Sequence, residues 1–398
     1  MKHRTMVAMV AAGALLAVSC GDDNDSAADT TSGGAATSAA PATEPAMTEA
    51  PATSAASSEP SAPVTSEAPA TSEAPATSEA PATSAGGGGG GEACAETEGA
   101  VVGYSEPIPD PNFALIEAVI SSELEEVGAE LIAVNAQLDP GKQIADVQTL
   151  QQQGIDVLLI NPVAPEAVQG VIGEVQAADI PVIVQDTKFG GPYTSNVTAD
   201  VETAAREGAA RLKELVGDGQ VTAIIGPPFA EVLVREAEAF AAAAEEIGLN
   251  VVDTQTNQQI TPDGARALAE AWKQQYGADL AGVWTFNDTS ATGVASAFDD
   301  SFQPALVSIN GQPEAIPLVT EGVIDATWDL QQDMLGRALA YAAIASICGE
   351  ELPEDIWVES QLIDADNVAE WVNPAERGEE DIDVELQEID GRTFLVQS

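Results

Sequence analysis

Short apolar runs alternate with longer amphipathic stretches from about residue 98 onward, and this alternation limits the possible folds most strongly. Apolar runs without polar alternation are typical of strands buried on both faces of a parallel sheet, and the stretches between them have helical length. We therefore expect an α/β fold, and about 265 residues are enough for two lobes. Strands are expected at 100–104, 130–135, 156–161, 181–185, 221–226, 249–253, 281–286, 304–309 and 324–328, and helices at 112–126, 140–153, 165–178, 200–216, 230–247, 262–275, 288–299 and 331–347.

The first 20 residues have the layout of a secretory signal. Lys2 and Arg4 precede an apolar run of about 14 residues, which is too short to span a bilayer. The closing sequence, Ala-Val-Ser-Cys, resembles the lipobox of bacterial lipoproteins, which implies that Cys20 is lipidated and becomes the mature N-terminus. An ordinary cleaved signal is the alternative. We expect an exported protein held by its lipid at the outer face of the cytoplasmic membrane.

Residues 21–97 are expected to be a disordered tether. Most of the segment consists of Ala, Pro, Thr, Ser, Glu and Gly, with SEAPAT repeated from Ser66, Ser72 and Ser78. Such a composition buries too little apolar surface to offset the conformational entropy of the chain. As a flexible coil, about 70 residues span roughly 45 Å root-mean-square, enough to lift a domain off a membrane.

Charge and residue usage exclude several classes of function. The net charge of −52 argues against a nucleic-acid-binding face. The only histidine, His3, lies in the signal, so the mature chain lacks His-based metal sites and Ser–His–Asp triads. We expect no metal and no cofactor. Outside the cytosol, Cys94 and Cys348 could form a disulfide, the alternative being two separate buried thiols.

Polar and aromatic side chains recur just after the predicted strands, where ligands of open α/β sheets bind. Turn and cap preferences explain single Asp and Asn residues at such places, but not a whole series beside aromatics. Carboxylates, amides and an arginine suit vicinal hydroxyls, and aromatic faces suit the C–H side of a sugar ring. The sequence therefore predicts a neutral polyhydroxy ligand, with a cationic ligand as the alternative because acids outnumber bases around the site. The series comprises the loop from Tyr104 to Phe113, Gln185-Asp186, Asn287-Asp288, Asn310, Asp329 and Arg235, with Trp284, Phe286 and Trp328 nearby.

Residues 98–364 resemble the type I periplasmic solute-binding proteins, specifically the ribose/galactose-like sugar receptors of ABC transporters. The segments DPNFALIEAV, GIDVLLINPVAPEAV, IPVIVQDT, FND, LVSINGQPEA and ATWDLQQDMLG carry this resemblance in order. It implies two Rossmann-like lobes with parallel sheets, joined by a three-strand hinge. The N-terminal lobe would comprise 98–200 and 330–350, and the C-terminal lobe 201–329 and 351–364. Residues 365–398 would form an extension with a hairpin around Asp390-Gly391.

The same resemblance implies a set of ligand-binding residues. It also shows departures, since Asn112 replaces an aromatic residue, Thr187 replaces an arginine, and Asn310 replaces an aspartate. These departures disfavour ribose and favour another monosaccharide or a polyol. The implied residues are Asp110, Asn112, Phe113 and Asp186 from the first lobe and Arg235, Asn287, Asn310 and Asp329 from the second, with Tyr104, Gln259 and Trp328 as weaker candidates.

The leading hypothesis is a monomeric, lipid-anchored receptor that closes on its ligand by a hinge and delivers it to an ABC permease. A sensory lipoprotein of the same fold is one alternative. A carboxylate-based glycoside hydrolase using Asp186 and Asp329 is another, and it requires two carboxyl groups facing one substrate. The leading hypothesis predicts a protein that is not an enzyme and that contacts the membrane only through its lipid.

Overall fold

The computed structural model describes residues 94–188, 191–299 and 301–398. The predicted signal, Cys20 and the tether up to residue 93 lie outside the described residues. Residues 94–97, assigned to the tether above, form a turn in which the Thr97 amide donates to the Cys94 carbonyl over 3.3 Å. A disulfide joins Cys94 to Cys348, with 5.8 Å between their Cα atoms. None of the described helices is long and apolar enough to cross a membrane.

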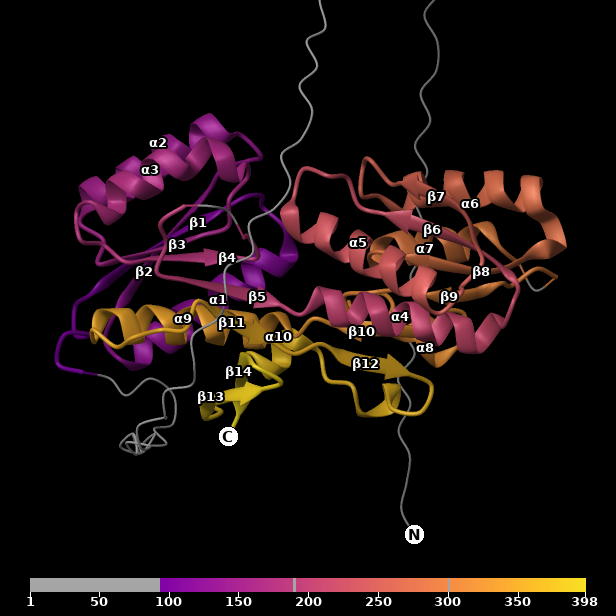
Figure 1. Ribbon diagram of the computed structural model, residues 1–398. Helices are drawn as coiled ribbons and strands as arrows, with labels where there is room; N and C mark the ends of the chain where they lie inside the picture. The colour runs from indigo at the N-terminus through magenta and orange to yellow at the C-terminus, as the bar shows by residue number, and fades with distance from the viewer. Residues whose placement is uncertain (1–93, 189–190, 300) are drawn as a thin grey trace, which may run out of the picture. The chain divides into compact units, whose positions relative to one another are not determined.

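The described chain folds into two α/β lobes, each built on its own sheet (Figure 1). The sheet of the first lobe has the strand order β13-β14-β11-β5-β4-β3-β1-β2. All neighbours in it are parallel except the hairpin of β13 and β14. Its strands are β1 (Val101–Glu106), β2 (Glu130–Asn135), β3 (Val157–Ile160), β4 (Val182–Gln185), β5 (Ser195–Ala199), β11 (Asp355–Val358), β13 (Val384–Ile389) and β14 (Arg392–Gln397).

The sheet of the second lobe has the strand order β12-β10-β9-β8-β6-β7, and only β12 runs antiparallel to its neighbour. This arrangement agrees with the parallel α/β lobes expected from the apolar runs. Its strands are β6 (Gln220–Ile225), β7 (Val251–Thr256), β8 (Leu280–Thr285), β9 (Ala305–Val307), β10 (Ala326–Asp329) and β12 (Gln361–Asp364).

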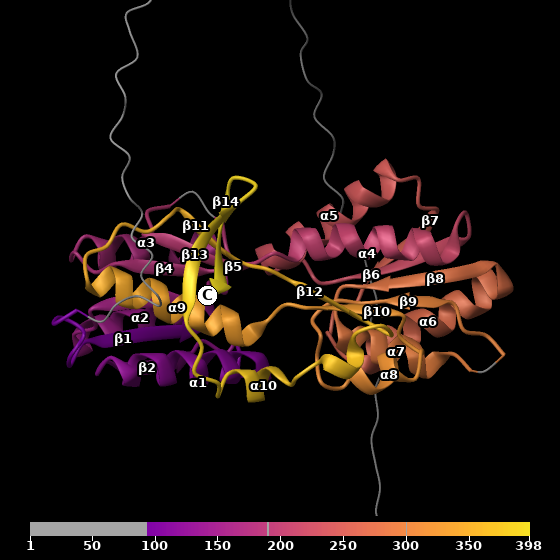
Figure 2. The same ribbon diagram turned by 90° about the horizontal axis from the view of Figure 1, so that it is seen from below.

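Helices cover both faces of each sheet. In the first lobe, α2 and α3 pack on one face, and α1 and α9 on the other (Figure 1). In the second lobe, α4 and α5 lie opposite α6 and α7 (Figure 2). The helices are α1 (Pro111–Glu126), α2 (Pro140–Gln153), α3 (Pro165–Gln176), α4 (Val201–Val216), α5 (Glu231–Glu246), α6 (Pro262–Tyr276), α7 (Asp288–Ala297), α8 (Ile316–Thr320), α9 (Gln332–Ile347) and α10 (Pro374–Arg377).

Three crossovers join the lobes, as the resemblance implied. The chain passes from β5 to α4, from β10 to α9, and from β11 to β12. The third crossover corrects one predicted boundary. Residues 351–364 were assigned to the second lobe, but β11 pairs with β5 in the first sheet and only β12 joins the second. The prediction missed this because it contained neither β5 nor β11.

The C-terminal extension makes a further passage back to the first lobe. Strands β13 and β14 form a hairpin closed by Asp390 and Gly391, and β14 pairs with β11 through Phe394 and Trp357. The extension also binds two crossovers. Arg392 contacts the Asp200 carboxylate over 2.6 Å at the first crossover, and Arg377 binds both ends of the second. The extension is therefore an integral part of the hinge region.

Candidate functional site

A cavity of about 290 Å³ lies between the carboxyl ends of the strands of the two lobes. Loops after β1, β2, β3 and β4 line it from the first lobe, and loops after β6, β7, β8 and β9 line it from the second. The structure thus brings together six residues predicted from sequence, namely Asp110, Asn112, Phe113, Asp186, Asn287 and Asn310.

On the first-lobe side, Asp110 forms the entrance to α1. Its Oδ1 accepts the Asn112 amide over 2.9 Å, and Pro111 occupies the first helical position. This is a helix N-cap in which the carboxylate satisfies a backbone donor. The next two residues, Asn112 and Phe113, project from the first turn of α1 and line the cavity.

Asp186 follows β4 with a left-handed backbone, φ 54°. Its Oδ1 accepts the Ala199 amide over 3.1 Å and the Thr198 hydroxyl over 3.2 Å, while Oδ2 accepts Gln185 Nε2 over 3.2 Å. Burial raises the pKa of this carboxyl, and these hydrogen bonds together with the nearby Arg235 oppose the rise. The bonds fix the orientation of the carboxylate at the cavity wall.

On the second-lobe side, Asn287 caps α7, since its Oδ1 accepts the Ser290 amide over 2.8 Å. Asn310 follows β9 with φ 116°, a conformation that an asparagine adopts more readily than most residues. The neighbouring Gln312 also lines the cavity, and its Oε1 accepts the Thr289 hydroxyl over 3.2 Å. Three amide side chains therefore face the cavity from this lobe.

Apolar side chains complete the cavity. Phe113 and Phe286 lie in its walls, and Leu138 and Phe229, from opposite lobes, are 50% and 49% exposed. No lysine or arginine occurs among the described residues that line it, whereas two aspartates do. The cavity therefore combines carboxylate and amide groups with apolar surface and disfavours an anionic ligand.

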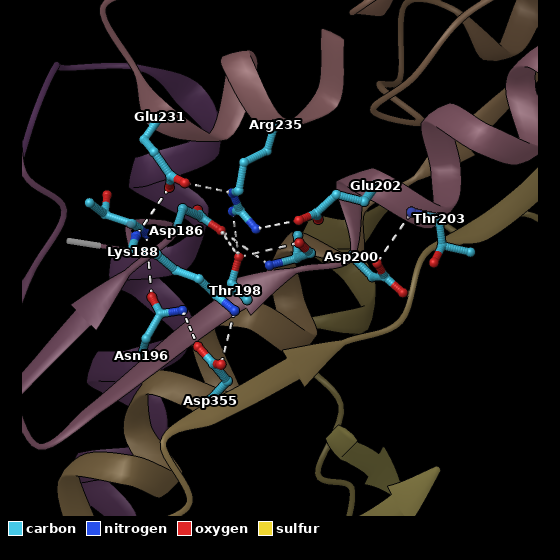
Figure 3. A network of polar contacts seen from close by, with 12 residues as sticks. Asp186, Lys188, Asn196, Thr198, Asp200, Glu202, Thr203, Glu231, Arg235 and Asp355 are labelled. Carbon is cyan, nitrogen blue, oxygen red and sulfur yellow. Dashed lines mark hydrogen bonds and ion pairs between the residues drawn. The ribbon is translucent and has the colours of Figure 1, made fainter. Parts of the chain in front are cut away.

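A polar network links the lobes beside the cavity (Figure 3). Arg235 on α5 binds Glu202 over 2.9 Å and Glu231 over 3.2 Å, and it donates to the Thr198 hydroxyl over 3.1 Å. Thr198 in turn donates to Asp186. Arg235 does not line the cavity, because two carboxylates and this hydroxyl engage its guanidinium. The structure therefore places Arg235 outside the cavity lining, one hydroxyl away from Asp186, and its contact with ligand stays a prediction.

Asp329 also lies outside the cavity lining. Its side chain is fully buried and pairs with Arg377 over 2.8 Å, while Arg377 also binds Asp333 over 2.7 Å. Burial raises the pKa of Asp329, and the pairing with Arg377 opposes the rise. The structure therefore places Asp329 outside the cavity lining, and its contact with ligand stays a prediction.

The three weaker candidates lie outside the cavity lining as well. Tyr104 is buried and donates to Gln185 over 2.7 Å, so it acts on Asp186 through that glutamine. Trp328 is buried and donates its indole N–H to Glu207 over 2.8 Å. Gln259 is exposed on the loop after β7. Some aromatic residues near strand ends thus form the cavity wall, as Phe286 does, whereas Tyr104 lies behind the wall and holds Gln185 by a hydrogen bond.

The family described as "Periplasmic binding protein domain" matches residues 107–351, more than half of the chain. The chain belongs to this family of periplasmic binding proteins. Membership makes it a substrate-binding protein of the transporter type and not an enzyme.

The similar proteins include sugar receptors. The ribose import binding protein RbsB of Bacillus subtilis is 28% identical over 251 residues, which cover 62% of this chain and 81% of that protein. The galactofuranose-binding protein YtfQ of Escherichia coli is 26% identical over 259 residues, which cover 60% of this chain and 79% of that protein. An ABC transporter solute binding protein from Mycobacterium smegmatis, solved with bound glycerol, is 25% identical and has a TM-score of 0.62. The match covers 68% of this chain and 96% of that protein.

This periplasmic binding protein contains cavity residues that the sequence reasoning missed. Asn161 directly follows β3, so the strand-end rule itself could have found it. Gln312 and Phe229 lie farther along their loops, and no pattern in the sequence distinguishes them from other loop residues. In the described ranges, no group of three or more His, Cys, Asp and Glu side chains could hold a metal ion.

Proposed function

We propose that this periplasmic binding protein captures a neutral monosaccharide or polyol in the cavity between its lobes and delivers it to an ABC importer. The observation that carries the proposal is the composition of the cavity lining. Carboxylates from the first lobe and amide groups from both lobes face one space of about 290 Å³, together with phenylalanines, and none of the described lining residues is a lysine or arginine. Such groups pair with vicinal hydroxyls, and the aromatic faces cover C–H surfaces.

The position of these groups on both lobes supports a hinge mechanism. A ligand that binds Asp186 on one lobe and Asn287 on the other gains contacts from both only when the lobes close around it. The ligand then shifts the population toward the closed form by its higher affinity for that form. The closed, loaded receptor would be the form that the importer recognises.

A thermal-shift screen of the full chain tests the ligand class. The panel contains neutral monosaccharides, polyols, uronates, sugar phosphates, amino acids and polyamines. We expect one or a few neutral sugars or polyols to raise the melting temperature by several degrees, because a ligand present at 100 times its Kd stabilises the native state by about 2.7 kcal/mol. Stabilisation by amino acids or polyamines alone would refute the sugar assignment.

We further propose that the protein is exported and anchored by a lipid on Cys20, with residues 21–97 as the tether. The apolar segment followed by Ala-Val-Ser-Cys supports this part of the proposal. The test compares membrane and soluble fractions of a bacterial host expressing the full chain or Cys20→Ala. We expect the natural protein in the membrane fraction and the variant outside it. An equal distribution of the two proteins would exclude the anchor.

A further inference from the structure

Asp288 is a fully buried carboxylate that the cavity does not use directly. It is the first residue of α7 and directly follows Asn287, which lines the cavity. Its Oδ2 accepts the Gln312 amide over 2.7 Å, and its Oδ1 accepts the hydroxyls of Thr327, over 2.8 Å, and Ser308. One side chain therefore joins the start of α7 to β10, to the end of β9 and to the loop beyond β9.

That loop, residues 310–312, contributes Asn310 and Gln312 to the second-lobe wall of the cavity. The Gly311 amide donates to Thr327 Oγ1 over 3.2 Å, and the same hydroxyl donates to Asp288. Two successive loop amides thus depend on Asp288, that of Gln312 directly and that of Gly311 through Thr327. A hydrogen bond from the Asn310 amide to the Trp328 carbonyl, over 2.8 Å, fixes the start of the loop.

The loop needs such support because its backbone is in an uncommon conformation. Asn310 and Gly311 have φ values of 116° and 63°. A Cβ atom added to Gly311 would lie 2.5 Å from Asp329 Cα, so the loop also packs closely against the end of β10. A sparsely populated backbone of this kind persists only where the surrounding contacts determine it.

We infer that Asp288 is a positioning residue, which holds loop 310–312 in the conformation that presents Asn310 and Gln312 to the ligand. The inference concerns the loop of the unliganded protein, and its consequence for sugar affinity rests on the proposed function. Asp288 acts through the backbone of the loop and not by touching the ligand, since it lies behind the cavity wall.

The partners of Asp288 also define which substitution preserves its role. Oδ1 faces two hydroxyls, which can donate or accept, whereas Oδ2 faces a backbone N–H, which can only donate. Burial raises the pKa of Asp288 to about 7, and the nearby Glu314 adds to the rise. A proton on Oδ1 leaves the bond to Gln312 in place, because a hydroxyl beside Oδ1 can accept a hydrogen bond from that proton as well as donate one. Asparagine can make the same contacts with its NH₂ toward the hydroxyls and its oxygen toward Gln312.

The test measures amide hydrogen exchange of Gly311 and Gln312 in the unliganded full chain, corrected for intrinsic rates, and then the affinity for the sugar found in the screen. In Asp288→Leu we expect both amides to exchange at least about tenfold faster and the Kd to rise about tenfold, the effect of one lost hydrogen bond to a charged group. Asp288→Asn should keep both properties within about threefold of the natural protein, since it preserves the bonds.

Two further variants separate positioning from general destabilisation. Thr327→Val removes the acceptor of Gly311 while keeping side-chain shape, so the Gly311 amide should lose protection even if Asp288→Leu does not fold. Val294→Ala removes a buried contact on the same helix, α7, and should lower the melting temperature without changing the loop amides.

Unchanged exchange of both loop amides in Asp288→Leu, or of the Gly311 amide in Thr327→Val, would overturn the inference. Faster exchange with an unchanged Kd would show that loop order does not govern binding, and would also overturn it. If the natural protein binds no sugar, the proposed function fails, but the exchange rates still decide whether Asp288 positions the loop.

Discussion

Asp186 in the first lobe and Asp288 in the second are both acids beyond the end of a strand, but they perform different tasks. Each follows the carboxyl end of a parallel strand, β4 in one lobe and β8 in the other. Each accepts a backbone amide and at least one hydroxyl, and burial raises the pKa of both. Only Asp186 lines the cavity, while Asp288 lies behind it.

The difference arises from the residues beside each aspartate. After β8, Asn287 takes the position that faces the cavity and caps α7, and this places the next residue, Asp288, inside the lobe. After β4, no helix begins, and Asp186 itself turns at the cavity wall with φ 54°. In this protein the start of the following helix therefore decides whether an acid beyond a strand lines the cavity or lies behind it.

We expect the greatest change in free energy from the titration of Asp288, which makes the stability of the protein depend on pH. The pKa of Asp288 rises from the ordinary 3.8 to about 7 in the folded protein. Between these values the folded state holds a proton that the unfolded state releases, so stability falls as pH rises from about 4 to about 7. The full loss is on the order of 4 kcal/mol.

Urea unfolding of the natural protein and Asp288→Asn between pH 4 and pH 8 measures this effect. Because asparagine does not titrate, the free energy of unfolding of the variant should rise relative to the natural protein as pH increases. Asp186 and Asp200 have shifted pKa values in both proteins, so their contributions to the pH dependence cancel in the difference between the two free energies of unfolding. A difference that stays constant across this pH range would contradict the prediction.

A third strand-end acid, Asp329, extends the comparison to a carboxylate paired with a cation. Arg377→Met would leave Asp329 buried without its ion-pair partner, and we expect a loss of about 3 kcal/mol in the free energy of unfolding at pH 7. The double variant with Asp329→Asn should recover part of the loss.

The control for this prediction is Arg266→Met, which breaks a pair with Glu270 whose side chains are 51% and 49% exposed. Exposed pairs of this kind contribute up to about 1 kcal/mol. Equal losses in Arg377→Met and Arg266→Met would show that the C-terminal extension does not stabilise the second crossover through Arg377.

A change in sugar affinity is a smaller effect in free energy, but it tests the proposed function most directly. Asp186→Asn should weaken sugar binding about tenfold, because the charged acceptor at the cavity wall is lost and the NH₂ group of asparagine must face a donor that the carboxylate accepts. Isothermal titration with the sugar from the screen measures it. The matched control is Asp263→Asn on α6, an exposed aspartate outside the cavity lining. Similar affinities of the two variants would remove Asp186 from the set of ligand groups.

Local sequence signals predicted most of the regular structure correctly. The apolar runs correspond to strands of both sheets, the Asp110-Pro111 pair starts α1, and Gly154 ends α2 with φ 84°. These features depend on neighbours within a few residues, so a pattern in the sequence is enough to reveal them.

Strand β5, with the sequence SNVTA, shows where such signals fail. Its polar side chains are buried because tertiary partners satisfy them: Ser195 donates to the Pro353 carbonyl over 2.8 Å, and Asn196 donates to Asp355 over 2.8 Å. Those partners lie about 160 residues later along the chain. Without them the segment reads as a polar loop, and for this reason the placement of β11 in the first lobe was also missed.

The α/β class, the two lobes and the strand ends that build the cavity can be read from the sequence, since they follow from periodicity and chain order. The sequence could not determine which strand-end acids face the cavity. Asp329 pairs with Arg377, 48 residues away, and Arg235 forms ion pairs with Glu202 and Glu231. Only the tertiary structure decides this, because the role of a charged side chain depends on the partners that folding brings within a few ångströms of it.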